Sequence, residues 1–122
     1  YELVAGGKKL LGSAQNRRAR VVLQHGSLPL FGDLTRLVEC LALPDENARA
    51  ALRRNLADHA TTVEQVLGRR ASFDEVAEAM ALGFSEALGL NLVPGELTPD
   101  ELTLADQLLH EQYDHPDWTE RT

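Results

Sequence analysis

Residues 7–15 read GKKLLGSAQ, and residues 23–27 read LQHGS. The first segment is preceded by Gly6, and paired glycines supply the positive φ angles that a tight hairpin requires. Small residues at positions 12–14 remove side-chain bulk, so that a ligand can lie against the strand backbone and reach its amides. The stretch therefore predicts a hairpin that leads into a strand with a slot for a thin ligand.

The first quarter of the chain is predicted to be an antiparallel meander. Its expected strands cover residues 1–5, 8–15 and about 20–30, with residues 16–18 as a polar connection between the second and third. The first strand has no earlier strand to pair with, and we expect an upstream sheet to cover this edge in the intact protein.

Beyond Gly32 the apolar spacing changes from two to three or four, which predicts helices. The best-defined helix begins at a capping box of Ser72 and Glu75 and ends at Gly89. The other expected elements are a helix capped by Asp33 and stopped by Pro44, a helix over 46–57, a turn over 62–67, a strand over 90–93 and a final helix capped by residues 98–101. The polar tail over 113–122 carries Trp118.

The pattern indicates an α/β (α+β) architecture, with the antiparallel β-meander over residues 1–32 and mainly helical structure over 33–122. The hydrophobic content of 43% is sufficient for one packed core in a chain of 122 residues. We expect the helical apolar stripes to face that core, and the whole chain to be one domain or part of a larger one.

Charge is distributed unevenly along the chain. Residues 1–25 carry a net charge of +4 and the remainder carries −11, which together make the net charge of −7. The positive end is suited to an anionic ligand. Overall acidity and the lack of interleaved aromatic residues argue against nucleic acid as a partner.

Cysteine and histidine usage points to the cytoplasm and to no metal site. The solitary Cys40 cannot form an intramolecular disulfide, and its position among apolar residues predicts a buried, inert thiol in the middle of a helix. No apolar segment is long enough to span a bilayer. The histidines are scattered, and the closest pair is five residues apart, which does not put both rings on one helical face.

Lys8 and Lys9 are the first candidates for chemistry. Strand alternation directs them to opposite faces, so only one can point into the slot. An ammonium beside a pocket of low dielectric can bind a carboxylate or phosphate, or stabilise a developing oxyanion. The alternative from spacing alone is a pair of solvated lysines after a hairpin turn.

The ordered set GKKLLGSAQ, Arg18 and LQHGS resembles the signature of the lipoate–protein ligase and octanoyltransferase family. The capped helix over 72–88, the LTPDEL segment at 97–102 and the terminal pairing of Tyr113 with Trp118 are also similar to that family's C-terminal half. The resemblance covers essentially all of residues 1–122 and implies the C-terminal part of a catalytic domain shared with biotin protein ligases. In that fold a mixed sheet cradles an extended acyl chain.

The resemblance also implies roles for individual residues. A lysine at the position of Lys9 contacts the acyl carbonyl, or the carboxylate and phosphate of an acyl-adenylate, and acts as the catalytic residue. The residues carried over as acyl or substrate binding are Gly12, Ser13 and Ala14 as pocket wall, His25 and Gly26 as pocket support, and Gln15 and Arg18 as ligand contacts or loop frame. The family's nucleophilic cysteine is expected shortly before Tyr1.

Three functions follow as hypotheses. The first is protein lipoylation by transfer of an octanoyl or lipoyl group from a carrier, such as acyl carrier protein, to the lysine of a lipoyl domain. The second is an ATP-dependent and magnesium-dependent lipoate–protein ligase. The third is a non-catalytic fragment or accessory domain that only binds carrier protein. Neither a membrane nor nucleic acid is expected as a partner.

Overall fold

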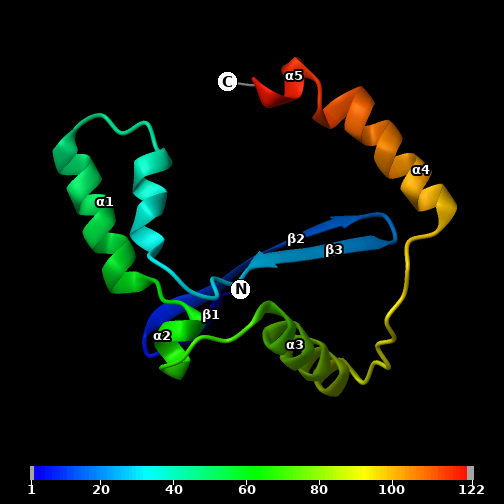
Figure 1. Ribbon diagram of the computed structural model, residues 1–122, viewed down its shortest axis with the longest axis horizontal. Helices are drawn as coiled ribbons and strands as arrows, with labels where there is room; N and C mark the ends of the chain where they lie inside the picture. Colours follow the sequence, from blue (N-terminus) through cyan, green and yellow to red (C-terminus); the bar gives the residue numbers. More distant parts are fainter. Residues whose placement is uncertain (1, 121–122) are drawn as a thin grey trace. The chain divides into compact units, whose positions relative to one another are not determined.

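The computed structural model describes residues 2–120, and the chain divides into two compact units between Gly83 and Phe84. The first unit contains a three-stranded antiparallel sheet followed by helices, and the second is helical (Figure 1). The predicted α+β class, a β-meander followed by helices, is confirmed.

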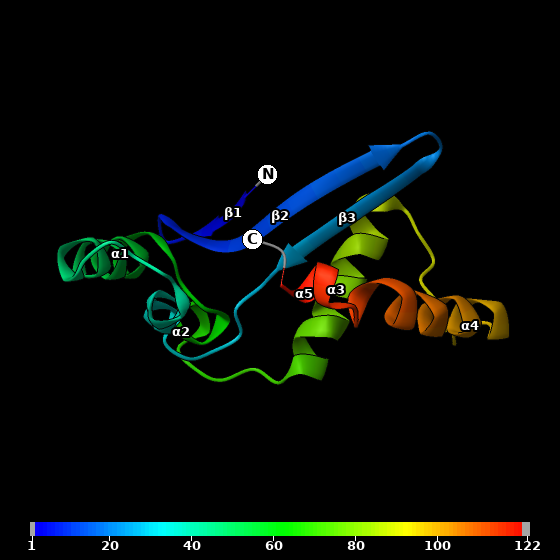
Figure 2. The ribbon, with the colours of Figure 1, turned by 90° about the horizontal axis from the view of Figure 1, so that it is seen from above.

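The sheet consists of β1 (Glu2–Ala5), β2 (Lys8–Arg18) and β3 (Val21–Ser27), paired in that order. Figure 2 shows β2 and β3 as a long hairpin. Gly6 and Gly7 have φ values of +56° and +78°, so the predicted glycine turn between β1 and β2 is present.

The expected polar connection over residues 16–18 is wrong, because these residues belong to β2. Arg18 pairs with Val21, and the turn lies at Ala19, whose φ is +47°. Polar side chains do not prevent backbone pairing when the strand is exposed. The hairpin therefore extends three residues further than the polarity of its side chains suggested.

Three helical elements follow the sheet in the first unit. They are the 3₁₀ helix η1 (Leu34–Cys40), α1 (Glu46–His59) and α2 (Val63–Leu67). Asp33 caps η1 through Thr35 N, as expected, although the element is a 3₁₀ helix that ends before Pro44. Figure 1 shows η1 beside α1, and the Arg49 guanidinium donates to the Val38 carbonyl across them at 2.7 Å.

The best-buried part of the described chain is the segment that links α1 to α2. Thr61, Thr62 and Val63 are buried there, and the Val63 N–H donates to the Pro29 carbonyl at 2.9 Å. The other buried hydrophobic side chains are Val38 and Ala71. This small group is the core of the first unit, and it joins the start of β2 to the loop after β3.

The expected single core lined by the helical stripes is wrong for the residues described. Large apolar side chains of the sheet and of the helices remain exposed. In the sheet they are Leu3, Val4, Val21, Val22 and Leu23, and in the helices they include Phe73, Phe84, Leu88 and Leu102. An amphipathic face is buried only where another element packs on it. Periodicity thus located the apolar faces but not what covers them.

Helix α3 (Phe73–Leu88) spans the boundary between the units. The Ser72 hydroxyl accepts from Glu75 N at 3.1 Å, which is the predicted cap, whereas the Glu75 carboxylate pairs with Arg69. At the other end, Gly89 has φ +64° and Leu90 N donates to the Ser85 carbonyl at 3.1 Å, as in a Schellman motif.

The second unit continues with α4 (Pro99–Leu108), the π-helical turn η2 (Leu109–Tyr113) and the short α5 (Pro116–Thr119). The predicted cap at Thr98 and Glu101 is a full capping box. Tyr113 and Trp118 meet edge to face with 4.9 Å between ring centroids, in agreement with the expected pairing.

The strand predicted over residues 90–93 is wrong, since this segment is irregular in the structure. Leu90, Leu92 and Val93 all expose about half or more of their surface. A strand needs a partner to satisfy its backbone groups, and an apolar composition alone does not provide one.

Replacing Thr62 with valine is expected to destabilise the first unit by about 1–2 kcal/mol, because the Thr62 hydroxyl caps α2 from a fully buried position. Valine keeps the shape and removes the acceptor for Gln65 N. Urea denaturation measures the change. Thr103→Val is the control, since that exposed hydroxyl bonds only the Pro99 carbonyl within α4; equal losses for both variants would contradict the prediction.

Candidate functional site

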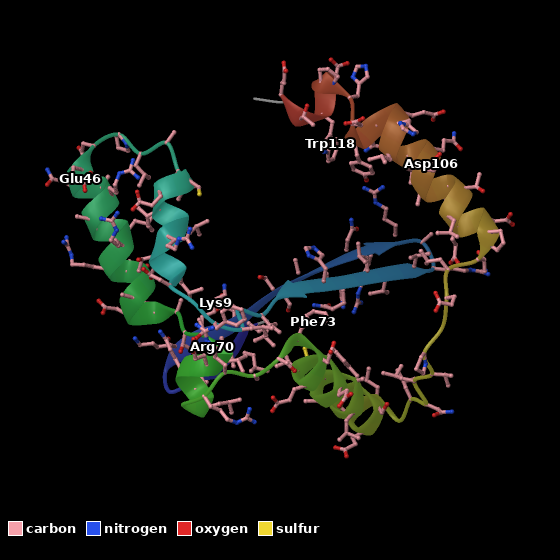
Figure 3. All side chains as sticks on the ribbon, in the orientation of Figure 1. Lys9, Glu46, Arg70, Phe73, Asp106 and Trp118 are labelled. Atoms are coloured by element: carbon pink, nitrogen blue, oxygen red, sulfur yellow. The ribbon has the colours of Figure 1, made fainter. Side chains whose placement is uncertain are left out.

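The two lysines at the start of β2 have different environments. Lys8 is half-buried, and its ammonium donates to the Ala57 carbonyl in the last turn of α1 at 2.5 Å. A cation at the C-terminal end of a helix satisfies free carbonyls and complements the helix dipole. Lys9 instead forms an ion pair with Glu2 of β1. Lys8 therefore bonds the end of α1, whereas the ammonium of Lys9 remains on the sheet. Figure 3 labels Lys9.

A β-bulge decides the direction of Lys9. Leu11 pairs with Leu3 and Lys9 with Val4, so that Leu10 is an extra residue in β2. Simple alternation from position 9 to 12 would put Lys9 and Gly12 on opposite faces. A bulge shifts the alternation by one residue, which is how such irregularities redirect side chains.

Gly12 lies directly beneath the Lys9 side chain. A Cβ added at Gly12 would stand 3.0 Å from Lys9 Cε and 3.4 Å from Nζ. Glu2 is the register partner of Gly12 in β1, so its carboxylate reaches Lys9 across the glycine. Both side chains remain about half exposed, at 47% for Lys9 and 57% for Glu2. The glycine thus provides the space in which this ion pair forms.

Register divides the predicted site residues between two faces. Ala14 alternates with Gly12 and pairs with His25, so these three residues share the face of Lys9. Arg18 has the same parity and lines a shallow hollow on the hairpin. The face that carries Lys9 therefore holds a lysine, a histidine and two small residues in a row.

The remaining predicted residues lie on the opposite face. Ser13 pairs with Gly26, and Gln15 pairs with Gln24, whose side-chain oxygen accepts from Gln15 Nε2 at 3.0 Å. Gln15 also accepts from the Arg17 side chain at 2.6 Å. The triplet 12–14 therefore cannot form one wall through its side chains, although its backbone borders both faces.

Gly26 is required by close packing between β2 and β3. An added Cβ would meet the Gly12 carbonyl oxygen at 2.9 Å and Ser13 Cβ at 3.3 Å. Backbone atoms cannot move aside cheaply in a paired strand. Gly26 therefore supports the site by allowing β3 to lie close beside Gly12 in the sheet.

The buried segment after α1 holds the backbone of Lys9. Thr61 N donates to the Lys9 carbonyl at 3.0 Å, and Ala60 forms a parallel bridge with Lys9. The Thr61 hydroxyl in turn bonds the Gln65 side chain at 2.9 Å. Sequence reasoning missed both Thr61 and Glu2; Glu2 could have been noticed as the only acidic residue among the first 25.

Cys40 differs from its prediction. It is exposed and is the last residue of η1, so the expected buried thiol in the middle of a helix is wrong. The short 3₁₀ helix has tighter geometry than an α-helix, so the apolar positions of the segment do not all share one covered side.

Among residues 2–120, no group of three or more His, Cys, Asp or Glu side chains is arranged to hold a metal ion. None of the helices described is both long enough and apolar enough to cross a membrane.

The Glu2–Lys9 pair predicts a measurable titration. The hydrogen bond and charge of Lys9 lower the pKa of the Glu2 carboxyl below its ordinary value. Replacing Lys9 with methionine should return the pKa of Glu2 towards that value, as followed by the carboxyl carbon shift in NMR. Because the folded-state pKa is the lower one, the pair stabilises the fold above the ordinary pKa of glutamate, and this contribution disappears as pH falls through the lowered value. An unchanged Glu2 titration in the variant would contradict the pairing.

Comparison with known proteins shows the family of this chain. The profile of the lipoyl protein ligase A/B catalytic domain matches residues 1–85. Octanoyltransferase LipM of Kyrpidia tusciae is 47% identical over 109 residues, which are 89% of this chain and 40% of that protein. Octanoyltransferase LipM of Symbiobacterium thermophilum is 41% identical over 121 residues, or 99% of this chain and 44% of that protein.

A solved structure agrees. The bi-partite lipoate protein ligase from Thermoplasma acidophilum, studied as part of an archaeal lipoylation system with its E2 lipoyl domain, is similar with a TM-score of 0.85 and 29% sequence identity. The similarity covers 96% of this chain and 45% of that one.

The chain belongs to the lipoyl protein ligase A/B catalytic domain family. It spans about two fifths of the length of the curated relatives it matches.

Proposed function

We propose that this chain supplies the catalytic lysine and part of the acyl-binding sheet of an octanoyltransferase that acts on the lysine of a lipoyl domain. The observation that carries the proposal is the Lys9 ammonium, held on the sheet face above Gly12 with Ala14 and His25 on the same side. The names of the two relatives support octanoyl as the transferred group. The E2 lipoyl domain of the archaeal system supports a lipoyl domain as acceptor.

The chemistry assigned to Lys9 is stabilisation of negative charge on the acyl oxygen. In the second half of the transfer, the acceptor lysine nitrogen forms an amide bond to the acyl carbon and the bond to a thioester sulfur breaks. The sulfur leaves as a thiol with the proton lost by nitrogen. A positioned ammonium beside the carbonyl oxygen favours the charged intermediate over the neutral substrate.

The nucleophilic thiol is proposed to come from outside these 122 residues. Cys40, the solitary cysteine here, lies at the end of η1, and no charged side chain pairs with it among the contacts described. A reactive cysteine usually has a neighbouring cation or helix N-terminus that favours the thiolate. The covalent intermediate is therefore assigned to another cysteine of the native polypeptide.

A lipoate–protein ligase is the second candidate, favoured by the archaeal structure. In a ligase the same ammonium would meet the carboxylate of lipoate and the α-phosphate of its adenylate, with ATP and magnesium as requirements. The net positive charge of residues 1–25 is compatible with that anionic intermediate.

One assay separates the candidates. The full-length encoded polypeptide is incubated with octanoylated acyl carrier protein and a lipoyl domain, and the acceptor is weighed by mass spectrometry. An octanoyl increment without ATP supports the transferase. An increment that requires free acid, magnesium and ATP, with pyrophosphate release, supports the ligase instead. No increment under either condition rejects both, and we expect the 122-residue chain alone to show none because so much of its apolar surface is uncovered.

A further inference from the structure

We propose that Glu2 is a positioning residue for Lys9, which holds the lysine ammonium over Gly12 until the acyl group arrives. The proposal rests on the proposed function, because it assigns Glu2 a part in the same acyl-transfer site. Glu2 is the first residue of β1 and pairs with Gly12 of β2, and its carboxylate is the ion-pair partner of Lys9.

Three features of the backbone bring the Glu2 and Lys9 side chains together. The bulge at Leu10 turns Lys9 onto the face of Gly12. The register of β1 puts Glu2 opposite Gly12, so that the side chains of Glu2 and Lys9 leave the sheet on the same side. The glycine leaves open the space that a side chain would occupy between them.

The backbone of Lys9 is also fixed, by a hydrogen bond on the side of β2 opposite to β1. The Lys9 carbonyl accepts from Thr61 N, and Thr61 is itself buried and hydrogen-bonded to Gln65. The backbone of Lys9 is thus held from behind, while its side chain alone has four rotatable bonds and would otherwise sample many rotamers. The Glu2 carboxylate restrains the end of that side chain.

A carboxylate is a suitable restraint because its ion pair with Lys9 is weak enough to be partly replaced by a bond to the acyl group. The pair is about half exposed, and exposed ion pairs contribute little net free energy. The ammonium has three donors, so it can retain one bond to Glu2 while another meets the acyl carbonyl oxygen. Glu2 therefore limits the search of Lys9 without trapping it.

The first test measures kinetics in the full-length encoded polypeptide. Glu2→Ala is expected to lower kcat by about twofold to fivefold with little change in KM, because loss of a weak exposed ion pair frees the Lys9 side chain and misplacement of a catalytic group affects the transition state most. Glu2→Asp, which keeps the charge, should recover part of the loss. Glu39→Gln is the matched control, since it removes a similar exposed ion pair with Arg53 on η1 and α1 and should leave kcat unchanged.

A double-mutant cycle separates positioning from a structural role. In a Lys9→Ala background, Glu2→Ala should have almost no further effect on single-turnover acyl transfer, since there is nothing left to position. An equal loss in both backgrounds would overturn the proposal, as would a normal kcat for Glu2→Ala. A raised KM with normal kcat would also overturn it, because that result describes substrate binding.

A second readout does not depend on activity. The close approach of Lys9 Cε to Gly12 predicts a nuclear Overhauser contact between the Lys9 ε-protons and the Gly12 α-protons, which Glu2→Ala should abolish and Glu39→Gln should preserve. Persistence of this contact in Glu2→Ala overturns the positioning role. If the contact is present in the unmodified protein and lost in Glu2→Ala, but the unmodified protein transfers no acyl group, the proposed function fails while the placement of Lys9 by Glu2 stands.

Discussion

Replacement of Lys9 with alanine is expected to lower kcat for acyl transfer by about 10²–10³-fold, the usual loss when one donor to a developing oxyanion is removed. The ammonium is the cationic group that the structure holds over Gly12, with its backbone fixed by Thr61. The loss should appear in kcat and in kcat/KM together, because the interaction is made mainly in the transition state. Mass spectrometry of the acceptor domain at timed intervals measures it.

The neighbouring Lys8 provides the control. Its ammonium bonds the Ala57 carbonyl on the other side of β2, so Lys8→Ala should reduce stability by roughly 0.3–1 kcal/mol and leave kcat within a few-fold of normal. Comparable losses of activity in Lys8→Ala and Lys9→Ala would contradict separate roles for the two lysines. A Lys9→Ala enzyme with normal kcat would remove Lys9 from the mechanism.

Replacement of Gly26 with alanine is expected to destabilise the first unit by about 1–3 kcal/mol, as overpacking of a close contact does. The added Cβ would stand 2.9 Å from the Gly12 carbonyl oxygen, a distance that forces β2 and β3 apart at that pair. Because Gly12 lies beneath Lys9, displacement of its backbone should lower acyl transfer as well. Thermal denaturation and the transfer assay measure the two effects.

Gly83→Ala is the control for this substitution. Gly83 lies inside α3 with nothing near its added Cβ among the residues described, and alanine favours helix over glycine by roughly 1 kcal/mol. The change from glycine to alanine should therefore stabilise the protein at position 83 and destabilise it at position 26. Loss of stability at Gly83, or none at Gly26, would contradict the packing argument.

Local signals predicted the elements of this chain well. Gly6 and Gly7 form the first turn, Ser72 caps α3, and Thr98 with Glu101 forms a capping box. Each of these signals acts over a few residues, through a backbone angle or a side-chain hydrogen bond to a nearby amide. Such interactions are fully encoded in the neighbouring sequence, so they can be read without knowledge of the fold.

Signals that require a distant partner failed more often. The apolar segment 90–93 does not form a strand, and Cys40 is exposed. The apolar spacing predicts a stripe on each of α3 and α4, yet apolar residues of both helices remain exposed in the structure described. Strand formation and burial depend on which surfaces meet, and periodicity does not contain that information.

The sequence by itself determined the three strands of the meander, the positions of the main helices and their turns and caps, and its resemblance to a family pointed to Lys9 as the candidate catalytic residue. The tertiary structure alone decided that Lys9 lies over Gly12 beside Glu2, with Ala14 and His25 on that face and Ser13, Gln15 and Gly26 on the other. The physical reason is the bulge at Leu10, which shifts the side-chain alternation of β2 only because β1 pairs with it in that register.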